Sequence, residues 1–571
     1  DIAVRLGVPW IPAGDVEAFC HDVLGARIEI EYLPTLGRWE LATPAGRRGV
    51  AFNAEWGTLR ADAATLLRAS LNQQLHTVYD ETDDGRRVRN DPETIAAREK
   101  QDALAERFAG WIWEDPARSR RLTDRYNELF CSTAIPVHDG AHLTLPGLAA
   151  NFTPHGHQRD AVARILTDGR AMLAHAVGAG KTATMAMAAM EMRRLGLARK
   201  PALVVPNHML EQFAREWLQL YPTAKLLVAD REKLSKAHRT EFAARAATGD
   251  WDAIIFSQSS FVRLPLGPDL QVDYLSERLH HLRDALTASR QGKGLSVKRL
   301  ERYVADEEER IRKLQASHAK DDGVRFEQTG IDYLLVDEAH LFKNRRVASS
   351  IEGMAHPGSQ RAEDLDAKLW TLRRRHGHRV ATFATATPVA NSMAELWVMQ
   401  SYLQPDVLEG VGLAPFDAWA ANFGRTVTAL ELAPDGASWR LSTRFARFCN
   451  VPELMGLWRQ VADVRGAADL ALPVPNVAGG GPRTVVVPGS DALHDYVSLL
   501  AERAERVRNR AVDPTEDNML KITGDGRRAA LDLRLVGEPP GQSGGKLAAA
   551  ADNIATLWRD HSASRGALGD G

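Results

Sequence analysis

The stretch Leu173-Ala174-His175-Ala176-Val177-Gly178-Ala179-Gly180-Lys181-Thr182 decides the fold of this chain. A short apolar strand breaks into a glycine loop, and the glycines let successive backbone N–H groups converge on an anion. Lys181 places a positive charge where β- and γ-phosphates would lie, and the Thr182 hydroxyl can coordinate Mg²⁺. The helix expected from Thr182 to Leu195 points the positive end of its dipole at the same place. A full phosphate-loop pattern has glycine where this chain has His175, so the assignment needs support from motifs further along.

Two acidic residues follow a second apolar run. Tyr333-Leu334-Leu335-Val336 is strand-like and leads into Asp337-Glu338-Ala339-His340. An acid at the carboxyl end of a buried strand is where a nucleotide-bound Mg²⁺ needs its second anchor, so Asp337 is expected to hold the ion. Glu338 would orient or deprotonate the water that attacks the γ-phosphate.

Two further motifs frame these. The strand-like run Val380–Ala384 leads into Thr385-Ala386-Thr387-Pro388, and Phe152–Gln158 precedes a helix-like segment. The amide of Gln158 could read an adenine edge by a bidentate contact. Each motif alone is common in proteins, but their order along the chain indicates an NTPase site. The residues expected to hold ATP are Gln158, Gly178, Ala179, Gly180, Lys181 and Thr182, and Thr182 and Asp337 are expected to hold Mg²⁺.

This series resembles the superfamily 2 helicases and translocases. Gln158 is similar to their adenine-reading glutamine, Gly178–Thr182 to motif I, Asp337–His340 to motif II of the DEAH form and Thr385–Thr387 to motif III. The resemblance implies catalytic roles for Lys181, Asp337, Glu338 and His340. It also implies that His340, Thr385, Ala386 and Thr387 link the nucleotide state to nucleic-acid contact. The run from Thr385 to Ser392 is similar to a motif of Swi/Snf-type DNA translocases.

A second resemblance covers more of the chain. The text of Asn72–Trp113 and Asp517–Lys521 is similar to large phage- and plasmid-borne proteins that join an adenine-specific DNA methyltransferase to a helicase, including DarB-type antirestriction proteins. Residues 1–150 contain no Asn-Pro-Pro-Tyr or Asp-Pro-Pro-Tyr run, so the resemblance concerns the helicase half. A methyltransferase domain is expected upstream in the full-length protein. The chain begins without Met and ends in the small-residue run Ser562–Gly571, which favours a piece of something longer.

Composition sets looser bounds. The chain has 571 residues and a formal net charge of −2, so no global basic field attracts nucleic acid, and a DNA partner must be argued from motifs. The three cysteines have no paired spacing, which fits a reducing cytoplasm. The sequence contains no run of about 18 apolar residues, the length that a membrane-spanning helix requires. We therefore expect a cytoplasmic protein that does not act at a membrane.

Strand-like and helix-like runs alternate through the middle of the chain, which predicts an α/β fold with a RecA-like parallel sheet and helices on both faces. A charged insert between the third and fourth expected strands has the spacing of a helical hairpin. It is either a solvated arm or a protrusion that touches DNA or a partner. The five expected strands are Ala171–Ala174, Ala202–Val205, Ala253–Phe256, Tyr333–Val336 and Val380–Ala384.

Changes in pattern along the chain divide it into four parts. Residues 1–145 are expected to form an α+β accessory domain, and residues 146–404 the first RecA-like lobe, with the insert at 274–324. Residues 405–482 are expected to be mostly helical to about Gly466, followed by a Pro- and Gly-rich linker. Residues 483–571 would start a second, incomplete RecA-like lobe, with a first strand at Arg483–Pro488.

The leading hypothesis is an ATP-dependent helicase or translocase that moves on single- or double-stranded DNA. The alternative is a nucleotide-dependent DNA-binding module with little hydrolysis, because the arginines of motif VI, which act on the γ-phosphate, are not found in the incomplete second lobe. An unrelated phosphate-loop enzyme, such as a small-molecule kinase, would leave motifs II and III unexplained. Strand separation and duplex translocation both remain open.

Overall fold

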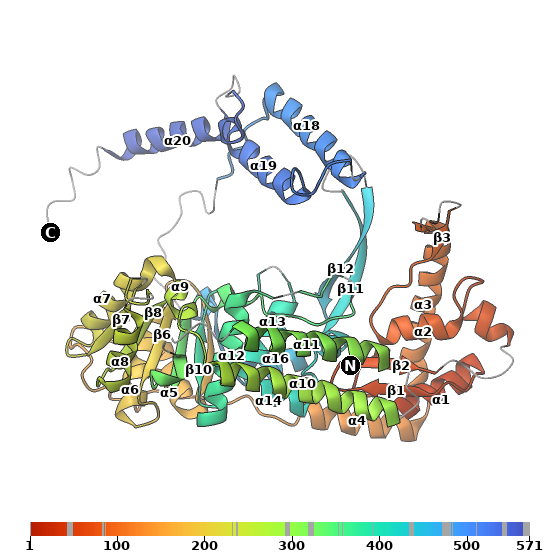
Figure 1. Ribbon diagram of the computed structural model, residues 1–571, viewed down its shortest axis with the longest axis horizontal. Helices are drawn as coiled ribbons and strands as arrows, with labels where there is room; N and C mark the ends of the chain where they lie inside the picture. Colours follow the sequence, from red (N-terminus) through yellow and green to blue (C-terminus); the bar gives the residue numbers. More distant parts are fainter. Residues whose placement is uncertain are drawn as a thin grey trace. The chain divides into compact units, whose positions relative to one another are not determined.

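The structure of the chain is a computed structural model (Figure 1). It describes residues 2–42, 49–82, 85, 87–230, 232–235, 238–291, 297–317, 325–351, 353–356, 358–390, 392–432, 439–470, 481, 483–509, 511–539 and 545–562. The chain forms two compact units. The first comprises residues 1–427 and 445–472, and the second comprises residues 428–444 and 473–571.

A seven-stranded sheet forms the centre of the first unit (Figure 1). Its neighbouring strands are all parallel, in the order β13-β5-β10-β9-β6-β8-β7. The predicted α/β parallel sheet is confirmed, with all five expected strands. The strands are β5 (Arg170–His175), β6 (Pro201–Val205), β7 (Leu226–Ala229), β8 (Ala253–Ser257), β9 (Tyr333–Asp337), β10 (Ala381–Ala384) and β13 (Ala462–Arg465).

Helices cover both faces of this sheet, because alternate residues of each strand point to opposite sides. Leu203 and Leu335 pack into the cluster of one face, and Val204 and Val336 pack into the cluster of the other. The five predicted strands consequently read as continuous apolar runs and not as alternating ones. The first face carries α5 (Gly156–Asp168), α6 (Lys181–Arg194) and α7 (Leu210–Leu220), and the second carries α8 (Arg239–Thr248), α9 (Gln258–Val262), α12 (Gln360–His376) and α13 (Ala394–Leu403).

The register of the central strands decides where their loops lie. Ala384, the last residue of β10, is opposite Leu173 of β5 on one side and Asp337 of β9 on the other. Parallel strands end at the same edge of a sheet. The loops that follow β5, β9 and β10 therefore start side by side.

The stretch after α13 differs from the prediction. Residues 405–466 were expected to be mostly helical, but they contain a long two-stranded hairpin and the edge strand β13. The sequence of the first hairpin strand contains Thr426, Val427 and Thr428, residue types that favour a strand. β13 is only four residues long and becomes a strand by pairing with β5, a contact that local sequence does not reveal. The elements are α14 (Pro405–Gly410), α15 (Phe416–Phe423), β11 (Gly424–Leu432), β12 (Trp439–Phe448), α16 (Val451–Arg459), β13 and α17 (Ala467–Leu470).

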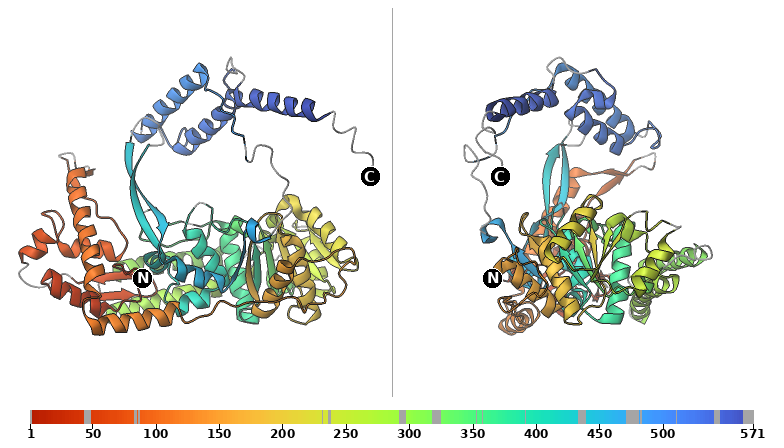
Figure 2. Two further views of the ribbon diagram at one scale, coloured as in Figure 1. Left: turned by 180° about the vertical axis from the view of Figure 1, so that it is seen from behind. Right: turned by 90° about the vertical axis from the view of Figure 1, so that its left-hand side faces the viewer.

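The predicted helical hairpin is confirmed as α10 (Pro268–Gln291) and α11 (Val297–Ser317), which lie side by side (Figures 1 and 2). Leu286 and Val304 pack between the two helices, and Leu36 of the accessory region packs against the same cluster. The Tyr274 hydroxyl donates to Asp366 of α12 over 2.6 Å. The apolar stripes of the two helices therefore pack on each other, and the insert also contacts the rest of the first unit.

The accessory region has the expected α+β character. Phe19, Phe108 and Trp111 form an edge-to-face aromatic cluster at its centre. The Gln74 side chain donates to Ser350 O over 2.9 Å, which attaches the region to the segment after β9. Its elements are α1 (Ala13–Leu24), β1 (Ile30–Leu33), β2 (Arg38–Leu41), the π-helix η1 (Ala51–Glu55), α2 (Ala63–Leu71), β3 (Tyr79–Glu81), β4 (Arg87–Arg89), α3 (Asp91–Trp111) and α4 (Pro116–Phe130).

The second unit does not confirm the expected second RecA-like lobe. The strand predicted at Arg483–Pro488 was wrong, because these residues form no strand in the described part of the chain. Val485 and Val486 are exposed, and no neighbouring strand is described that could complete a sheet with them. Of the linker expected at Pro473–Pro482, residues 473–480 and 482 lie outside the described residues. The helical elements of this unit are α18 (Asp491–Arg508), α19 (Met519–Leu531), the 3₁₀ turn η7 (Leu533–Val536) and α20 (Gly545–Ser562).

Across the described residues, no helix combines the length and the apolar character that crossing a bilayer requires.

Replacing Asp366 by alanine should destabilise the first unit. Its carboxylate accepts from Tyr274 and from Arg345 Nε at 2.9 Å, and the Asp366 side chain is only 7% exposed. Removing one partner of a buried ion pair leaves the other charge without compensation, so we expect a loss of about 3 kcal/mol in the free energy of unfolding. Urea unfolding followed by tryptophan fluorescence measures it. Asp273→Ala is the control, because Asp273 pairs with Arg374 at the surface and its removal should cost less than about 1 kcal/mol. Equal losses in the two variants would contradict the assignment.

Candidate nucleotide-binding site

The phosphate loop joins β5 to α6. Gly178 and Gly180 adopt φ angles of +85° and +73°, a region that residues with a side chain rarely enter. A Cβ at Gly180 would also lie 2.3 Å from Nε2 of Gln158. Both predicted glycines are thus required by the loop geometry. Thr182 follows as the second residue of α6 and is half-buried.

Lys181 folds back over this loop. Its Nζ donates to the carbonyl oxygens of His175 at 3.0 Å and Ala176 at 3.2 Å. Burial lowers the pKa of Lys181, while the charges of Asp337 and Glu338 raise it in part. The lysine of the first motif and the acids of the second therefore share one electrostatic site, as the sequence predicts.

Asp337 and Glu338 occupy two different environments at the end of β9. Asp337 is buried, and burial together with the charge of Glu338 raises its pKa to about 6. Glu338 has a φ of +47°, an unusual backbone conformation for a residue other than glycine. Such conformations cost on the order of 1–3 kcal/mol and cluster at functional sites. Glu338 thus has a strained backbone conformation directly after the buried carboxylate of Asp337.

His340 connects this segment to the loop after β10. It lies in the 3₁₀ turn η5 (Ala339–Phe342), with Nδ1 3.0 Å from Glu338 Oε2 and 3.0 Å from Thr385 Oγ1. Thr385 is fully buried, and its Oγ1 also accepts from the backbone N–H of Thr387 at 3.2 Å. Ala386, between them, is half-buried. The structure thus brings together the residues predicted to couple the two motifs.

Gln158 is placed differently from the simple prediction. Its side chain is buried, with Oε1 accepting from His155 N at 2.9 Å and Nε2 donating to Gly180 O at 3.2 Å. The amide therefore starts α5 and fastens the phosphate loop. To read adenine it would have to release Gly180 or use its remaining hydrogen-bond capacity. The adenine role of Gln158 stays a prediction.

Hydroxyl and carboxylate oxygens are the donors that Mg²⁺ prefers, and this ion usually keeps several waters while bridging to phosphates. The Thr182 hydroxyl and the Asp337 carboxylate fit that donor set. Three or more His, Cys, Asp or Glu side chains clustered for a metal are not found among the described residues. The chain's own contribution to Mg²⁺ would thus be two ligands completed by phosphate oxygens and water.

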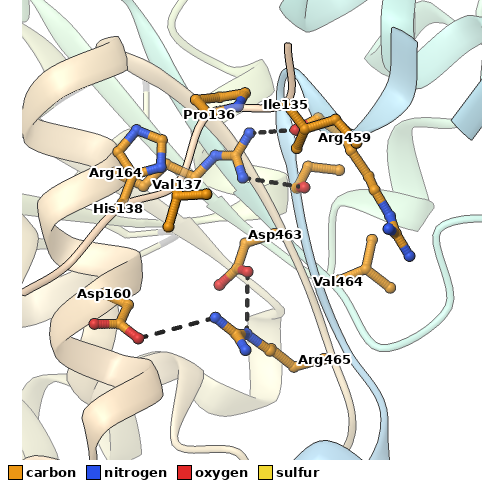
Figure 3. Close-up of a pocket in the computed structure, with 11 residues that line it drawn as sticks. Ile135, Pro136, Val137, His138, Asp160, Arg164, Arg459, Asp463, Val464 and Arg465 are labelled. Carbon is orange, nitrogen blue, oxygen red and sulfur yellow. Dashed lines mark hydrogen bonds and ion pairs between the residues drawn. The ribbon is translucent and has the colours of Figure 1, made fainter. Parts of the chain in front are cut away.

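Two contacts of the loop were missed in the sequence. His157 Nε2 lies 2.9 Å from Ala179 O, and His175 Nε2 lies 2.7 Å from Asp463 Oδ2 on β13. Figure 3 shows Asp463 and Arg465 facing α5 beside a small cavity of about 200 Å³. The only signal in the sequence was the replacement of a glycine by His175. Nothing local to residues 462–465 points to the loop.

Comparison with known protein families agrees with this geometry. The model of a family described as a probable helicase domain matches residues 164–466, which is more than half of the chain. The chain belongs to this helicase family. A second model, a domain of unknown function, matches residues 5–132, within the accessory region. The predicted resemblance to helicases is confirmed.

A phage protein is similar to most of this chain. The chain is 26% identical over 513 residues to the "Defense against restriction protein B" of Escherichia phage P1, a match that covers 80% of this chain. The chain spans only 22% of the length of that relative. The predicted similarity to DarB-type proteins is confirmed.

Two solved structures of a Sulfolobus solfataricus SWI2/SNF2 ATPase core are also similar. The one in complex with dsDNA is 13% identical, with a TM-score of 0.33, and covers 73% of this chain and 67% of that chain. The other is 14% identical, with a TM-score of 0.30, and covers 59% and 50%.

Replacing Asp337 by asparagine should stabilise the protein in EDTA. Its pKa in the folded state, about 6, lies above the ordinary value of 3.8, so the folded state binds this proton more tightly than the unfolded state does. The destabilising contribution of ionised Asp337 is therefore fully present above pH 6, and it disappears as the pH falls towards 4. An asparagine side chain cannot ionise, so Asp337→Asn should gain up to ~3 kcal/mol at pH 8 and progressively less below pH 6.

Thermal unfolding of both proteins across this pH range measures the gain, and adding Mg²⁺ with ADP should reverse the order by stabilising the wild-type protein alone. A variant that is less stable than the wild type in EDTA at pH 8 would contradict the assigned environment of Asp337.

Proposed function

We propose that this chain is the ATP-binding part of a DNA helicase or translocase, which couples ATP hydrolysis to movement on DNA. The observation that carries the proposal is the contact series from Glu338 through His340 to Thr385. It joins the residue suited to activate water to a buried hydroxyl in the loop after β10, the strand that pairs with β9. A small-molecule kinase has no need for such a link between hydrolysis and a second loop.

In this proposal each residue of the site has a defined task. The backbone of Gly178, Ala179 and Gly180 and the ammonium group of Lys181 bind the phosphates, and Gln158 contacts adenine. Thr182 and Asp337 bind Mg²⁺, which neutralises charge on the β- and γ-phosphates when bound. Glu338 accepts a proton from the attacking water.

A γ-phosphate would compete with the carbonyls of His175 and Ala176 for the ammonium group of Lys181. It would also change the charge next to Glu338, and with it the contact between the Glu338 carboxylate and His340 Nδ1. His340 would then pass the change to Thr385 and to the loop that continues through Thr387. Binding and release of the γ-phosphate would in this way alter the grip on DNA.

The DNA-binding side of the proposal lies at the same edge of the sheet. Asn207 and His208 follow β6 and are exposed, and Asn207 Oδ1 accepts from the backbone N–H of Ser259 after β8 at 3.1 Å. We propose that these exposed polar groups contact the phosphate backbone of DNA. Contacts of this kind bind without sequence preference, as a moving protein requires.

The second candidate is a nucleotide-dependent DNA-binding module that hydrolyses ATP slowly. It is favoured by one observation: from residue 481 onward the described residues form helices and no strand. A second RecA-like lobe, with the arginines that act on the γ-phosphate, is not part of what the structure describes. The chain could then bind ATP and DNA without rapid turnover.

The similarity to the phage relative extends the proposal to the full-length protein. We propose that it acts on DNA in the cytoplasm, next to an upstream methyltransferase domain. The relative is named for defence against restriction. A translocase joined to a methyltransferase could protect DNA in the same way.

ATP hydrolysis measured with and without single- and double-stranded DNA separates the two candidates. A motor should hydrolyse ATP several-fold faster with one of these DNAs. A binding module should bind DNA in an ATP-dependent manner, and its rate of ATP hydrolysis should stay low with and without DNA. Lys181→Ala should reduce hydrolysis at least ~100-fold, because it removes the charge that stabilises the transferred phosphoryl group. Hydrolysis that survives in Lys181→Ala would refute the site itself.

Thr385→Val should uncouple the motor. Valine keeps the shape of threonine but removes the hydroxyl that meets His340 Nδ1 and Thr387 N–H. We expect nucleotide affinity to change less than about threefold, while DNA stimulation of hydrolysis falls by about tenfold. The reason is that the hydrogen bonds of the lost hydroxyl contribute roughly 1–2 kcal/mol. Hydrolysis rates against DNA concentration provide the measurement. Full stimulation in Thr385→Val would exclude the proposed route.

A further inference from the structure

The phosphate loop departs from the glycine pattern at His175, and the structure shows what this side chain does. His175 is the last residue of β5, and its side chain is fully buried. Its Nε2 lies 2.7 Å from Asp463 Oδ2, whereas its Nδ1 is buried without a hydrogen-bond partner. Within the described residues, Asp463 is thus the polar contact that orients this imidazole.

Asp463 is suited to this contact because it stays charged. Burial would raise the pKa of Asp463, but the hydrogen bond from His175 and the charges of Arg465 and Arg164 lower it below its ordinary value. Arg465 Nε donates to Asp463 Oδ1 at 3.2 Å, so each carboxylate oxygen has its own donor (Figure 3). Hydrogen bonds to a charged acceptor are about twice as strong as neutral ones.

The backbone at His175 belongs to the phosphate loop. The N–H of Ala176 donates to Arg465 O at 2.9 Å, so β13 follows the chain one residue beyond the end of β5. The carbonyls of His175 and Ala176 are the two acceptors of Lys181 Nζ. Any displacement of β13 along β5 would therefore move the groups that hold the lysine.

β13 is itself held firmly where it enters the sheet. The guanidinium group of Arg164, on α5, donates to Arg459 O at 2.6 Å and to Ala462 O at 3.2 Å (Figure 3). Arg164 thus fixes the turn between α16 and β13. Asp463, the next residue, then meets His175 at a defined position along the strand.

We propose that Asp463 is a positioning residue for the phosphate loop, which sets nucleotide affinity by fixing His175 and, through its carbonyl, the resting place of Lys181. The inference rests on the proposed nucleotide site. Where the full phosphate-loop pattern has glycine, this loop has His175, and the contact of His175 with Asp463 on the neighbouring strand fixes its position. Nucleotide affinity is then tied to the strand that follows the β11–β12 hairpin in the chain. If instead the pair only fills space between β5 and β13, its loss would lower stability without a selective loss of affinity.

The test compares Asp463→Ala, Asp463→Asn, His175→Gly and the double variant His175→Gly with Asp463→Ala. Asp469→Asn is the matched control, because Asp469 caps Gly466 N at 2.8 Å just beyond β13 and does not touch the loop. The readouts are the dissociation constant of a fluorescent ADP analogue with Mg²⁺, KM and kcat for ATP, and the melting temperature. Asp463→Asn keeps the volume of the side chain, and the double variant removes both partners, so one of them should fold even if Asp463→Ala does not.

We expect Asp463→Ala to weaken nucleotide binding about tenfold and to raise KM with kcat changed less than about threefold. Asp463→Asn should fall between it and the wild type, and Asp469→Asn should match the wild type. In the His175→Gly background, Asp463→Ala should have no further effect on binding, because the contact is already absent. Unchanged nucleotide affinity in Asp463→Ala and Asp463→Asn would overturn the inference. It would also be overturned if Asp463→Ala weakened binding as much in His175→Gly as in the wild type. Failure of the wild type to bind the analogue would instead refute the nucleotide site.

Discussion

The backbone ladder that holds β10 between β5 and β9 is the constraint on which the rest of the site depends. Ala384 is level with Leu173 on one neighbour and with Asp337 on the other, so three chain segments leave the sheet at the same height. A slip of one residue in either pairing would turn every side chain of that strand to the opposite face. The two apolar clusters prevent such a slip, because each face of the sheet is filled by helices. Packing far from the loops thus defines the geometry within them.

Electrostatics then separates the tasks of groups that are close together. Lys181, Asp337 and Glu338 share one site, and burial acts on Lys181 and on Asp337 in the direction that disfavours the charge of each. A bound Mg²⁺ nucleotide supplies charges of both signs and would relieve these penalties. The site is therefore arranged for its ligand more than for the stability of the fold. The left-handed backbone conformation of Glu338 also costs stability of the fold, and such strain is typical of functional sites.

Two regions outside the sheet contact the segment that follows β9. Arg345, in this segment, pairs with Asp366 of α12, which also binds Tyr274 of the insert. Arg346 Nη1 lies 3.2 Å from Glu307 of α11, and Ser350 O accepts from Gln74 of the accessory region. The insert and the accessory region thus both contact the chain a few residues beyond the second motif.

Much of this could be predicted from the sequence, because the signals were local. A glycine loop before Lys181, an acid pair after an apolar run at Asp337 and the apolar stripes of the insert each follow from a few neighbouring residues, and the parallel sheet follows from their alternation. The same reasoning failed for β13, the β11–β12 hairpin and the expected strand at Arg483–Pro488. A strand is stabilised by its neighbours, so the residues at 462–465 become one beside β5, whereas Val485 and Val486 remain exposed, with no partner strand among the described residues.

The sequence by itself determined which chemical groups stand at the ends of the strands, and through them the family to which the chain belongs. Only the tertiary structure decided how those groups are held. The contacts of Gln158 with Gly180, of His340 with Thr385 and of His175 with Asp463 join residues that are 22 to 288 positions apart. No local pattern encodes such pairs, because they exist only once the sheet has set the register of its strands.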